Sequence, residues 1–222
     1  MLQASFAANG FELFPGVIAD GECEAIAGLI SLDADSVGSR CLIPNDWCAR
    51  LAKRIQYSSA MSGILPADYV VVQCTYFEKS ADRNWLVPVH QDLSIPVAEK
   101  VEDPILCGWS EKEGALHVQP PVETLEQLVA VRLHLDPCSA EDGPLRVVPG
   151  SHRCGRISPE AAVLARKNGE VVCESRQGGL LAMRPLLLHA SSKSTGTSRR
   201  RVLHFVFGPP VLKHGLRWRH AV

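Results

Sequence analysis

The chain has 222 residues, a length that suits a single domain with a substantial buried core. Hydrophobic residues make up 46% and charged residues 21%, as in ordinary globular proteins, and the formal net charge of −1 argues against a strongly basic nucleic-acid-binding protein. The eight cysteines are scattered without a C-x-x-C pair, which argues against a structural zinc site or a disulfide framework. No apolar run is long enough to span a membrane and no signal peptide is visible, so we expect a cytoplasmic protein with neither a membrane nor a nucleic-acid partner.

The first third of the chain is predicted to be helical, with one helix over 21–32 capped by Asp20 and a second over 46–65 capped by Asp46. From Tyr69 onward the pattern changes to short β-branched or alternating segments, separated by Gly, Pro, Asp and Ser, with one further helix over 158–169. The predicted strands are 69–77, 86–95, 128–135, 145–150, 179–185, 186–192 and 201–207.

Two helices followed by many short strands are typical of a β-sandwich or barrel with helices packed on one face. The segment from Ala98 to Gln127 is the exception, because it is long, polar and contains prolines. Loops of this length in a compact domain usually cover a functional site or are disordered, and this one could close over the mouth of the barrel.

The stretch VPVHQDLSIPV places a histidine and an aspartate two residues apart in a predicted strand. Side chains at i and i+2 of a strand point to the same side, so His90 and Asp92 could bind one metal ion. Facial coordination of non-haem Fe(II) needs a second histidine, and His189, at the end of an apolar run, is the candidate. A second H-x-D pair, His134 and Asp136, is the rival, but Asp136 directly precedes a proline, where a turn carboxylate is unremarkable.

Arg200 strengthens the assignment. It lies eleven residues after His189, at the start of a strand that we expect to run antiparallel to that of His189. A guanidinium in the cavity could form a two-pronged salt bridge with a carboxylate. A metal triad with a deep arginine is the layout that holds a 2-oxo diacid, with one end on iron and the other on arginine.

These segments together resemble the phytanoyl-CoA dioxygenase family. The resemblance covers most of residues 69–207, including the G-P-L-x-V-x-P-G-S-H turn, and extends more loosely to the helical N-terminus. It implies an α+β, mainly β fold: a double-stranded β-helix (jelly-roll) core with N-terminal helices packed on one sheet. It also implies a single oxygenase domain over 1–222, with 1–68 as helical support and 69–208 as the β-helix carrying the loop insertion 98–127.

The resemblance further implies the residue roles and the chemistry. His90, Asp92 and His189 match the iron ligands, Arg200 matches the arginine that binds the distal carboxylate of 2-oxoglutarate, and Ser191 matches its hydroxyl helper. The expected activity is an Fe(II)- and 2-oxoglutarate-dependent dioxygenase that hydroxylates a small organic molecule. The alternatives are a catalytically degenerate ligand-binding member and a cupin-type metal-dependent isomerase or lyase. Neither the substrate nor the oligomeric state follows from the sequence.

Two further residues are candidate cofactor contacts. Gln73 lies on the strand before the H-x-D pair, where family members often place a polar group. Arg132 stands where the family commonly has tryptophan beside the cofactor. If Arg132 faces the barrel interior, it requires an anionic partner: Glu111 or Glu113 of the insertion, 2-oxoglutarate, or an acidic substrate. If it faces outward, it is a solvated surface arginine.

Overall fold

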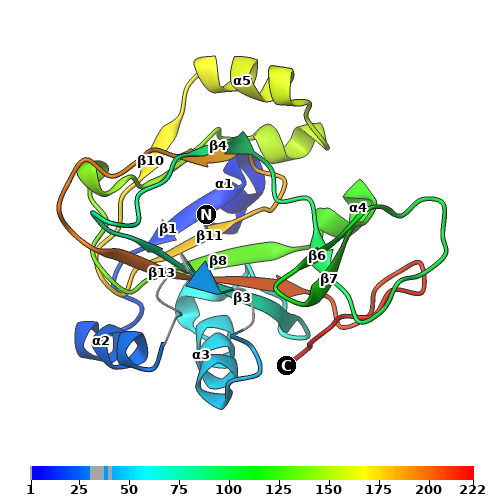
Figure 1. The fold of residues 1–222 in the computed structure, drawn as a ribbon, viewed down its shortest axis with the longest axis horizontal. Coiled ribbons are helices and arrows are strands. Elements are labelled where there is room, and N and C mark those ends of the chain that lie inside the picture. The colour runs from blue at the N-terminus through cyan, green and yellow to red at the C-terminus, as the bar shows by residue number, and fades with distance from the viewer. Residues whose placement is uncertain (1, 31–37, 40–41) are drawn as a thin grey trace.

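The computed structural model describes residues 2–30, 38–39 and 42–222. Two antiparallel sheets face each other (Figure 1). The larger sheet has the order β1-β11-β8-β13-β3-β2 and the smaller one the order β10-β9-β12-β4. Their strands are β1 (Phe11–Phe14), β2 (Gly38–Ser39), β3 (Val70–Lys79), β4 (Val87–His90), β8 (Val129–His134), β9 (Leu145–Val147), β10 (Val171–Cys173), β11 (Leu180–Met183), β12 (His189–Ser191) and β13 (Arg200–Gly208).

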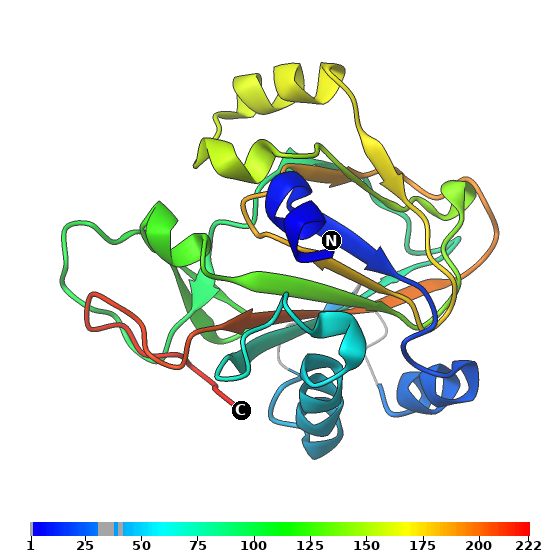
Figure 2. The same cartoon turned by 180° about the vertical axis from the view of Figure 1, so that it is seen from behind.

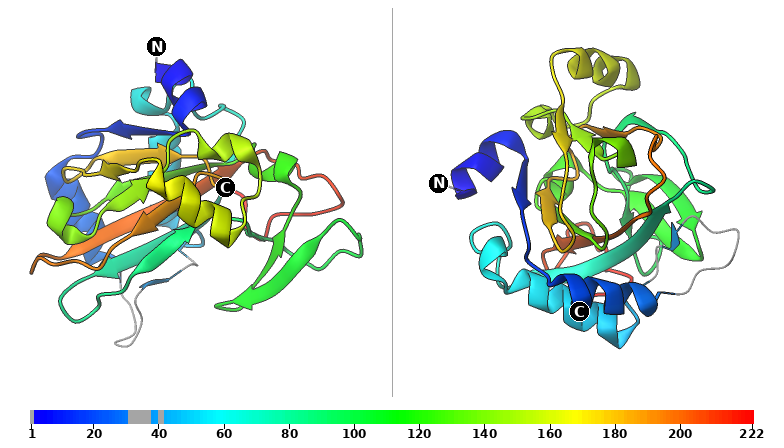
Figure 3. Two further views of the ribbon diagram at one scale, coloured as in Figure 1. Left: turned by 90° about the horizontal axis from the view of Figure 1, so that it is seen from above. Right: turned by 90° about the vertical axis from the view of Figure 1, so that its left-hand side faces the viewer.

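Helices α2 (Asp20–Gly28) and α3 (Asp46–Gln56) cover the outer face of the larger sheet (Figures 1 and 3). Successive side chains along each strand point alternately to the outer and the inner face of the larger sheet. Leu133 of β8 and Phe205 of β13 point outward into the main apolar cluster with the helix residues Leu51 and Ile55. The even-numbered residues of the same strands face the space between the sheets. The expected fold, a jelly-roll core with N-terminal helices on one sheet, is confirmed.

The N-terminal helices are shorter than the sequence predicted. Helix α2 begins at Asp20 with Ala19 as its cap, and α3 begins at Asp46 with Asn45 as its cap, so both aspartates lie in the first turn. Helix α3 ends at Gln56, and a separate 3-10 turn over Ser59–Met61 follows. The acidic side chains still lie at the positive helix ends, where they stabilise the helix dipole. Residues 31–32 of the first prediction lie outside the described residues.

The N-terminus also contains two elements that were not predicted. Helix α1 (Leu2–Asn9) leads into β1, which adds an edge strand antiparallel to β11. Figure 2 shows this pair from behind, next to α1. Helix α5 (Pro159–Lys167) fits its prediction, with Ser158 as the cap whose hydroxyl accepts from the Ala161 amide. None of the helices that the structure describes is long and apolar enough to span a membrane.

The segment 98–127 is not a loop. It contains β6 (Cys107–Lys112), β7 (Ala115–Gln119) and α4 (Val122–Leu125), and β7 also pairs with β5 (Ile95–Pro96). Figure 3 shows this small sheet extending to one side of the barrel. Its inner side packs in a second apolar cluster with the C-terminal Trp218. Some of the polar residues that suggested a loop, such as Glu111, are exposed and alternate with less exposed residues of the hairpin, a pattern that the prediction missed.

Candidate active site

The H-x-D pair and His189 meet between two paired strands of the smaller sheet. His90 ends β4, His189 begins β12, and the two are direct cross-strand partners. Asp92 lies beyond the end of β4, so the strand predicted over 86–95 ends five residues early, at His90. The Nε2 atoms of His90 and His189 lie 3.8 and 3.7 Å from the two carboxylate oxygens of Asp92. One donor atom from each residue lies within 4.8 Å of the others, a spacing that one metal ion can bridge.

Backbone carbonyls fix the two imidazoles for this role. The Nδ1 of His90 lies 2.9 Å from the carbonyl oxygen of Pro88, and the Nδ1 of His189 lies 2.8 Å from that of Leu187. A carbonyl can only accept, so each Nδ1 carries the proton and each Nε2 presents its lone pair toward Asp92. The amide of Asp92 donates to the carbonyl of Pro185 over 2.9 Å, which positions the third ligand. Such outer contacts are the usual support of metal-binding histidines.

The charge states also suit metal binding. Burial lowers the pKa of His189, although the nearby Asp92 opposes this, so the imidazole is neutral at neutral pH. Burial alone would raise the pKa of Asp92, but His189, His204 and His90 together lower it, so Asp92 is a carboxylate. Neutral imidazoles and an ionised carboxylate are the donor set of a non-haem Fe(II) site.

A cavity of about 340 Å³ lies beside the triad, and the charged residues that line it are Asp92, Lys112, Arg132 and Arg200. Arg200 is buried at the start of β13, where its Nη1 donates to the carbonyl of Gly143 over 2.5 Å. Its Nε has no hydrogen-bond partner among the described residues. Strands β12 and β13 belong to opposite sheets, so Arg200 faces the triad across the cavity rather than from a strand paired with that of His189. A buried donor without a partner is suited to an anionic ligand.

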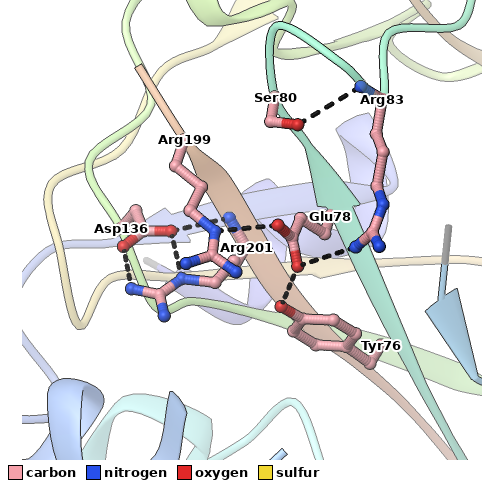
Figure 4. A network of polar contacts seen from close by, with 7 residues as sticks. All are labelled: Tyr76, Glu78, Ser80, Arg83, Asp136, Arg199 and Arg201. Atoms are coloured by element: carbon pink, nitrogen blue, oxygen red, sulfur yellow. Dashed lines mark hydrogen bonds and ion pairs between the residues drawn. The ribbon is translucent and has the colours of Figure 1, made fainter. Parts of the chain in front are cut away.

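The neighbouring arginines of the same run point away from the cavity. Arg201 forms a two-pronged salt bridge with Asp136, at 2.6 and 2.8 Å, on the outer face of the larger sheet (Figure 4). Arg199 donates to Glu78 over 2.8 Å on the same face (Figure 4). Strand alternation therefore leaves only Arg200 of the three facing the cavity.

The two residues of the rival pair, His134 and Asp136, point to opposite faces of the larger sheet and cannot bind one metal ion together. Asp136 is held by Arg201, whereas His134 points between the sheets and neither of its ring nitrogens has a hydrogen-bond partner in the described part of the chain. Burial lowers the pKa of His134 to about 3, so it is neutral. Among the described residues, the triad of His90, Asp92 and His189 is the one group with metal-binding spacing.

Ser191 and Gln73 both line the cavity, but at different places. The Oγ of Ser191 accepts a hydrogen bond from the Lys79 ammonium over 3.0 Å, and Lys79 is the cross-strand partner of Arg200. Gln73 lies six residues along β3 from Lys79 and donates to the Thr75 hydroxyl over 2.8 Å. Ser191 is thus close to the Arg200 end of the cavity and Gln73 to the opposite end.

Arg132 faces the cavity, so the interpretation as a solvated surface arginine is wrong. It is 7% exposed, lines the cavity, and lies over the Phe77 ring at 5.7 Å. Glu111 and Glu113 are exposed and neither lines the cavity, so they are not its partners in this structure. Glu111 lies on β6, and Glu113 lies in the turn that joins β6 to β7.

Sequence reasoning missed two residues of the site. Lys79 is buried and donates to Ser191 and to the carbonyl of Ser192, and His204 lies with its Nε2 3.8 Å from Asp92. Alternation from Gln73 along β3, and from Arg200 along β13, places both on the inner face. The predicted strand over 69–77 stopped two residues before Lys79, which hid the first of them.

The sequence profile described as Phytanoyl-CoA dioxygenase (PhyH) matches residues 38–202. The chain belongs to this family. Membership confirms the expected enzyme class, the Fe(II)- and 2-oxoglutarate-dependent dioxygenases, with the same pair of cofactors. No curated protein matches the chain.

Solved structures of similar fold include those of three proteins. The epimerase SnoN from nogalamycin biosynthesis, in complex with Fe3+, alpha ketoglutarate and nogalamycin RO, is 16% identical with a TM-score of 0.69, covering 94% of this chain and 82% of its own. HygX from Streptomyces hygroscopicus, with nickel and 2-oxoglutarate, is 18% identical (TM-score 0.64, coverage 94% and 86%). EctD from S. alaskensis, with 2-oxoglutarate and 5-hydroxyectoine, is 18% identical (TM-score 0.69, coverage 94% and 75%). At these identities the likeness shows the fold.

Proposed function

We propose that the protein uses Fe(II) and 2-oxoglutarate to hydroxylate a small organic molecule, with release of succinate and carbon dioxide. The observation that carries the proposal is the two-His-one-carboxylate cluster facing the buried Arg200 across one cavity. A cupin-type isomerase or lyase needs no such arginine, and a degenerate binding protein would have no reason to keep all four groups in place.

In this proposal, His90, Asp92 and His189 hold the iron, and the fit rests on the two Nε2 atoms that face Asp92. Bound iron supplies oxygen activation coupled to oxidative decarboxylation of 2-oxoglutarate, chemistry that the protein positions rather than performs. The carbonyls of Pro88 and Leu187 hold the imidazole orientation, so the histidines need no rearrangement on metal binding.

The distal carboxylate of 2-oxoglutarate is assigned to Arg200 and Ser191. Arg200 keeps a free buried Nε, and its Nη1 is anchored on Gly143, so the guanidinium is already oriented. Lys79 holds the Ser191 hydroxyl through a hydrogen bond. A contact between Gln73 and the cofactor remains part of the proposal, although Gln73 lies at the other end of the cavity.

One protein of similar fold, SnoN, is described as an epimerase. The test must therefore distinguish hydroxylation from epimerisation, in which no oxygen atom is added to the substrate. The decisive experiment has two steps. First, iron and 2-oxoglutarate binding are measured anaerobically. Second, a library of small molecules is screened for compounds that stimulate succinate formation, and the masses of the products are measured by mass spectrometry. Addition of one oxygen atom supports hydroxylation, whereas an isomer of unchanged mass supports epimerisation.

A further inference from the structure

Arg132 is a buried cation on the inner face of β8. It forms no ion pair with any residue that the structure describes, and its Nε lacks a hydrogen-bond partner there. Its guanidinium lies over the face of the Phe77 ring, which does not replace the lost hydration of a guanidinium. Burial lowers its pKa to about 10, so it remains charged at neutral pH.

The backbone of Arg132 occupies a different level of the sheet from that of Arg200. Arg132 on β8 is the cross-strand partner of His204 on β13, and His204 lies beside Asp92. With a strand rise of about 3.3 Å per residue, His204 lies about 13 Å along β13 from Arg200. The backbone of Arg132 is therefore level with the metal ligands, whereas Arg200 lies at the far end of the cavity. The Arg132 guanidinium leans from this level toward the Arg200 end, because it lies over the ring of Phe77, the cross-strand partner of Val202.

The charges of the cavity leave an excess of positive charge. Even without Lys112, the lining residues carry two guanidinium groups, those of Arg132 and Arg200, and one carboxylate, that of Asp92. The charges of Fe(II) and of 2-oxoglutarate cancel each other, so loading with both cofactors does not change this balance. A cavity that stays positive after its cofactors have bound favours an anion as the remaining occupant.

The wall next to Arg132 is apolar. The next inner-face pair along the sheet, Ala130 and Val206, lies on the side away from Arg200. Further apolar side chains of the lining continue this surface: Ile95, Leu125 and Leu128. A ligand that reaches Arg132 from this side therefore needs an apolar body as well as an anionic group.

We propose that Arg132 binds the anionic group of the substrate, so that the substrate class is small molecules with an apolar portion and one carboxylate, phosphate or sulfate. This inference rests on the proposed function, because it assumes that iron and 2-oxoglutarate occupy the triad and the Arg200 end. Arg132 then acts as a specificity residue that directs the substrate beside the metal, and a guanidinium is suited to two-pronged binding of such groups.

The test uses the protein loaded anaerobically with Fe(II) and saturating 2-oxoglutarate, which occupies the Arg200 end. Calorimetry measures binding of acetate, butyrate and hexanoate, and of the three corresponding amides as neutral probes of matched shape. We expect the wild-type protein to bind at least one carboxylate about tenfold or more tightly than its amide. Arg132→Met should remove this difference, with iron stoichiometry and 2-oxoglutarate affinity unchanged, whereas Arg199→Met, on the outer face, should preserve it.

Two results would overturn the inference. One is that no carboxylate binds more tightly than its amide to the loaded wild-type protein. The other is that Arg132→Met weakens 2-oxoglutarate binding about tenfold or more, which would assign Arg132 to the co-substrate. Failure of the wild-type protein to take up iron and 2-oxoglutarate in the loading step would instead contradict the proposed function, so the two failures are distinguishable.

Discussion

The Arg200 guanidinium is anchored on the carbonyl of Gly143, a hydrogen bond of 2.5 Å between the start of β13 and the turn before β9. Gly143 has a φ of +63°, and a Cβ at this position would lie 2.4 Å from the carbonyl oxygen of Ser192. The turn therefore requires glycine twice over, for its backbone conformation and for the close approach.

Gly143→Ala should consequently lower both stability and 2-oxoglutarate affinity while iron binding persists. Gly16→Ala is the matched control, because Gly16 has the same φ of +63° but a Cβ added there would meet no atom within 4 Å. We expect Gly143→Ala to lower the free energy of unfolding by about 1 kcal/mol or more beyond the control, as measured by urea denaturation. Equal effects of the two substitutions would show that the approach to Ser192 is unimportant.

The metal site is tested by removing its ligands one at a time. His90→Ala or His189→Ala should abolish iron binding, since a chelate with two protein ligands holds Fe(II) poorly. His134→Leu is the control and should keep full iron stoichiometry, because His134 lies apart from the triad. Metal analysis of the purified proteins gives the readout. Iron loss in the His134 variant, with retention in the His90 variant, would reverse the assignment.

Arg200 and Arg201 should respond differently to the same substitution. Arg200→Met should weaken 2-oxoglutarate binding by roughly 100-fold, because the distal carboxylate loses its buried partner. Arg201→Met should leave that affinity unchanged and lower stability instead, since it leaves Asp136 without its salt bridge. Titration with 2-oxoglutarate and thermal unfolding of both variants separate the two effects, and similar affinities in the two variants would exclude the role of Arg200.

Lys79 should make stability depend on pH. Burial, with smaller contributions from Arg200 and Arg132, lowers its pKa from 10.5 to about 7 in the folded protein. Between these values the unfolded chain binds more protons at Lys79 than the folded protein does, so this residue destabilises the fold most at low pH and less as the pH rises.

Lys79→Met removes this dependence. Relative to the variant, the wild-type protein should gain on the order of 2 kcal/mol of unfolding free energy from about pH 6 to about pH 9. Urea denaturation at the two pH values measures the gain, with substitution of the exposed Lys53 by methionine as the control. Parallel changes in the wild-type and Lys79→Met proteins would mean that Lys79 titrates normally.

Much of the fold could be predicted because strand alternation and turn residues are local signals. The strands β3, β8, β11 and β13 and the helix α5 lie where the sequence indicates them. The β6–β7 hairpin was missed because the burial of its inner face depends on Trp218, about a hundred residues further along the chain. No local pattern reports a partner at that separation, and tertiary packing decides the structure of such segments.

The candidate site could likewise be predicted only in part. His90, Asp92 and His189 could be selected from spacing and residue type, and the structure brings them together. Arg132, His204 and Lys79 lie on one surface because β8, β13 and β3 are neighbours in the sheet. This strand order could not be predicted from the sequence. Arg132 could be placed on either face until the order β11-β8-β13-β3 was known.

The outer-face salt bridges of β13 have a consequence for how the barrel assembles. Arg199, Arg200 and Arg201 are chemically identical, yet Glu78 and Asp136 offer carboxylates only to the first and the third. A slip of β13 by one residue would turn two arginines inward and send Arg200 to solvent, because strand side chains alternate strictly between faces. The two carboxylates therefore favour the observed register of β13. Only in this register do both outer arginines form salt bridges while a single guanidinium points inward.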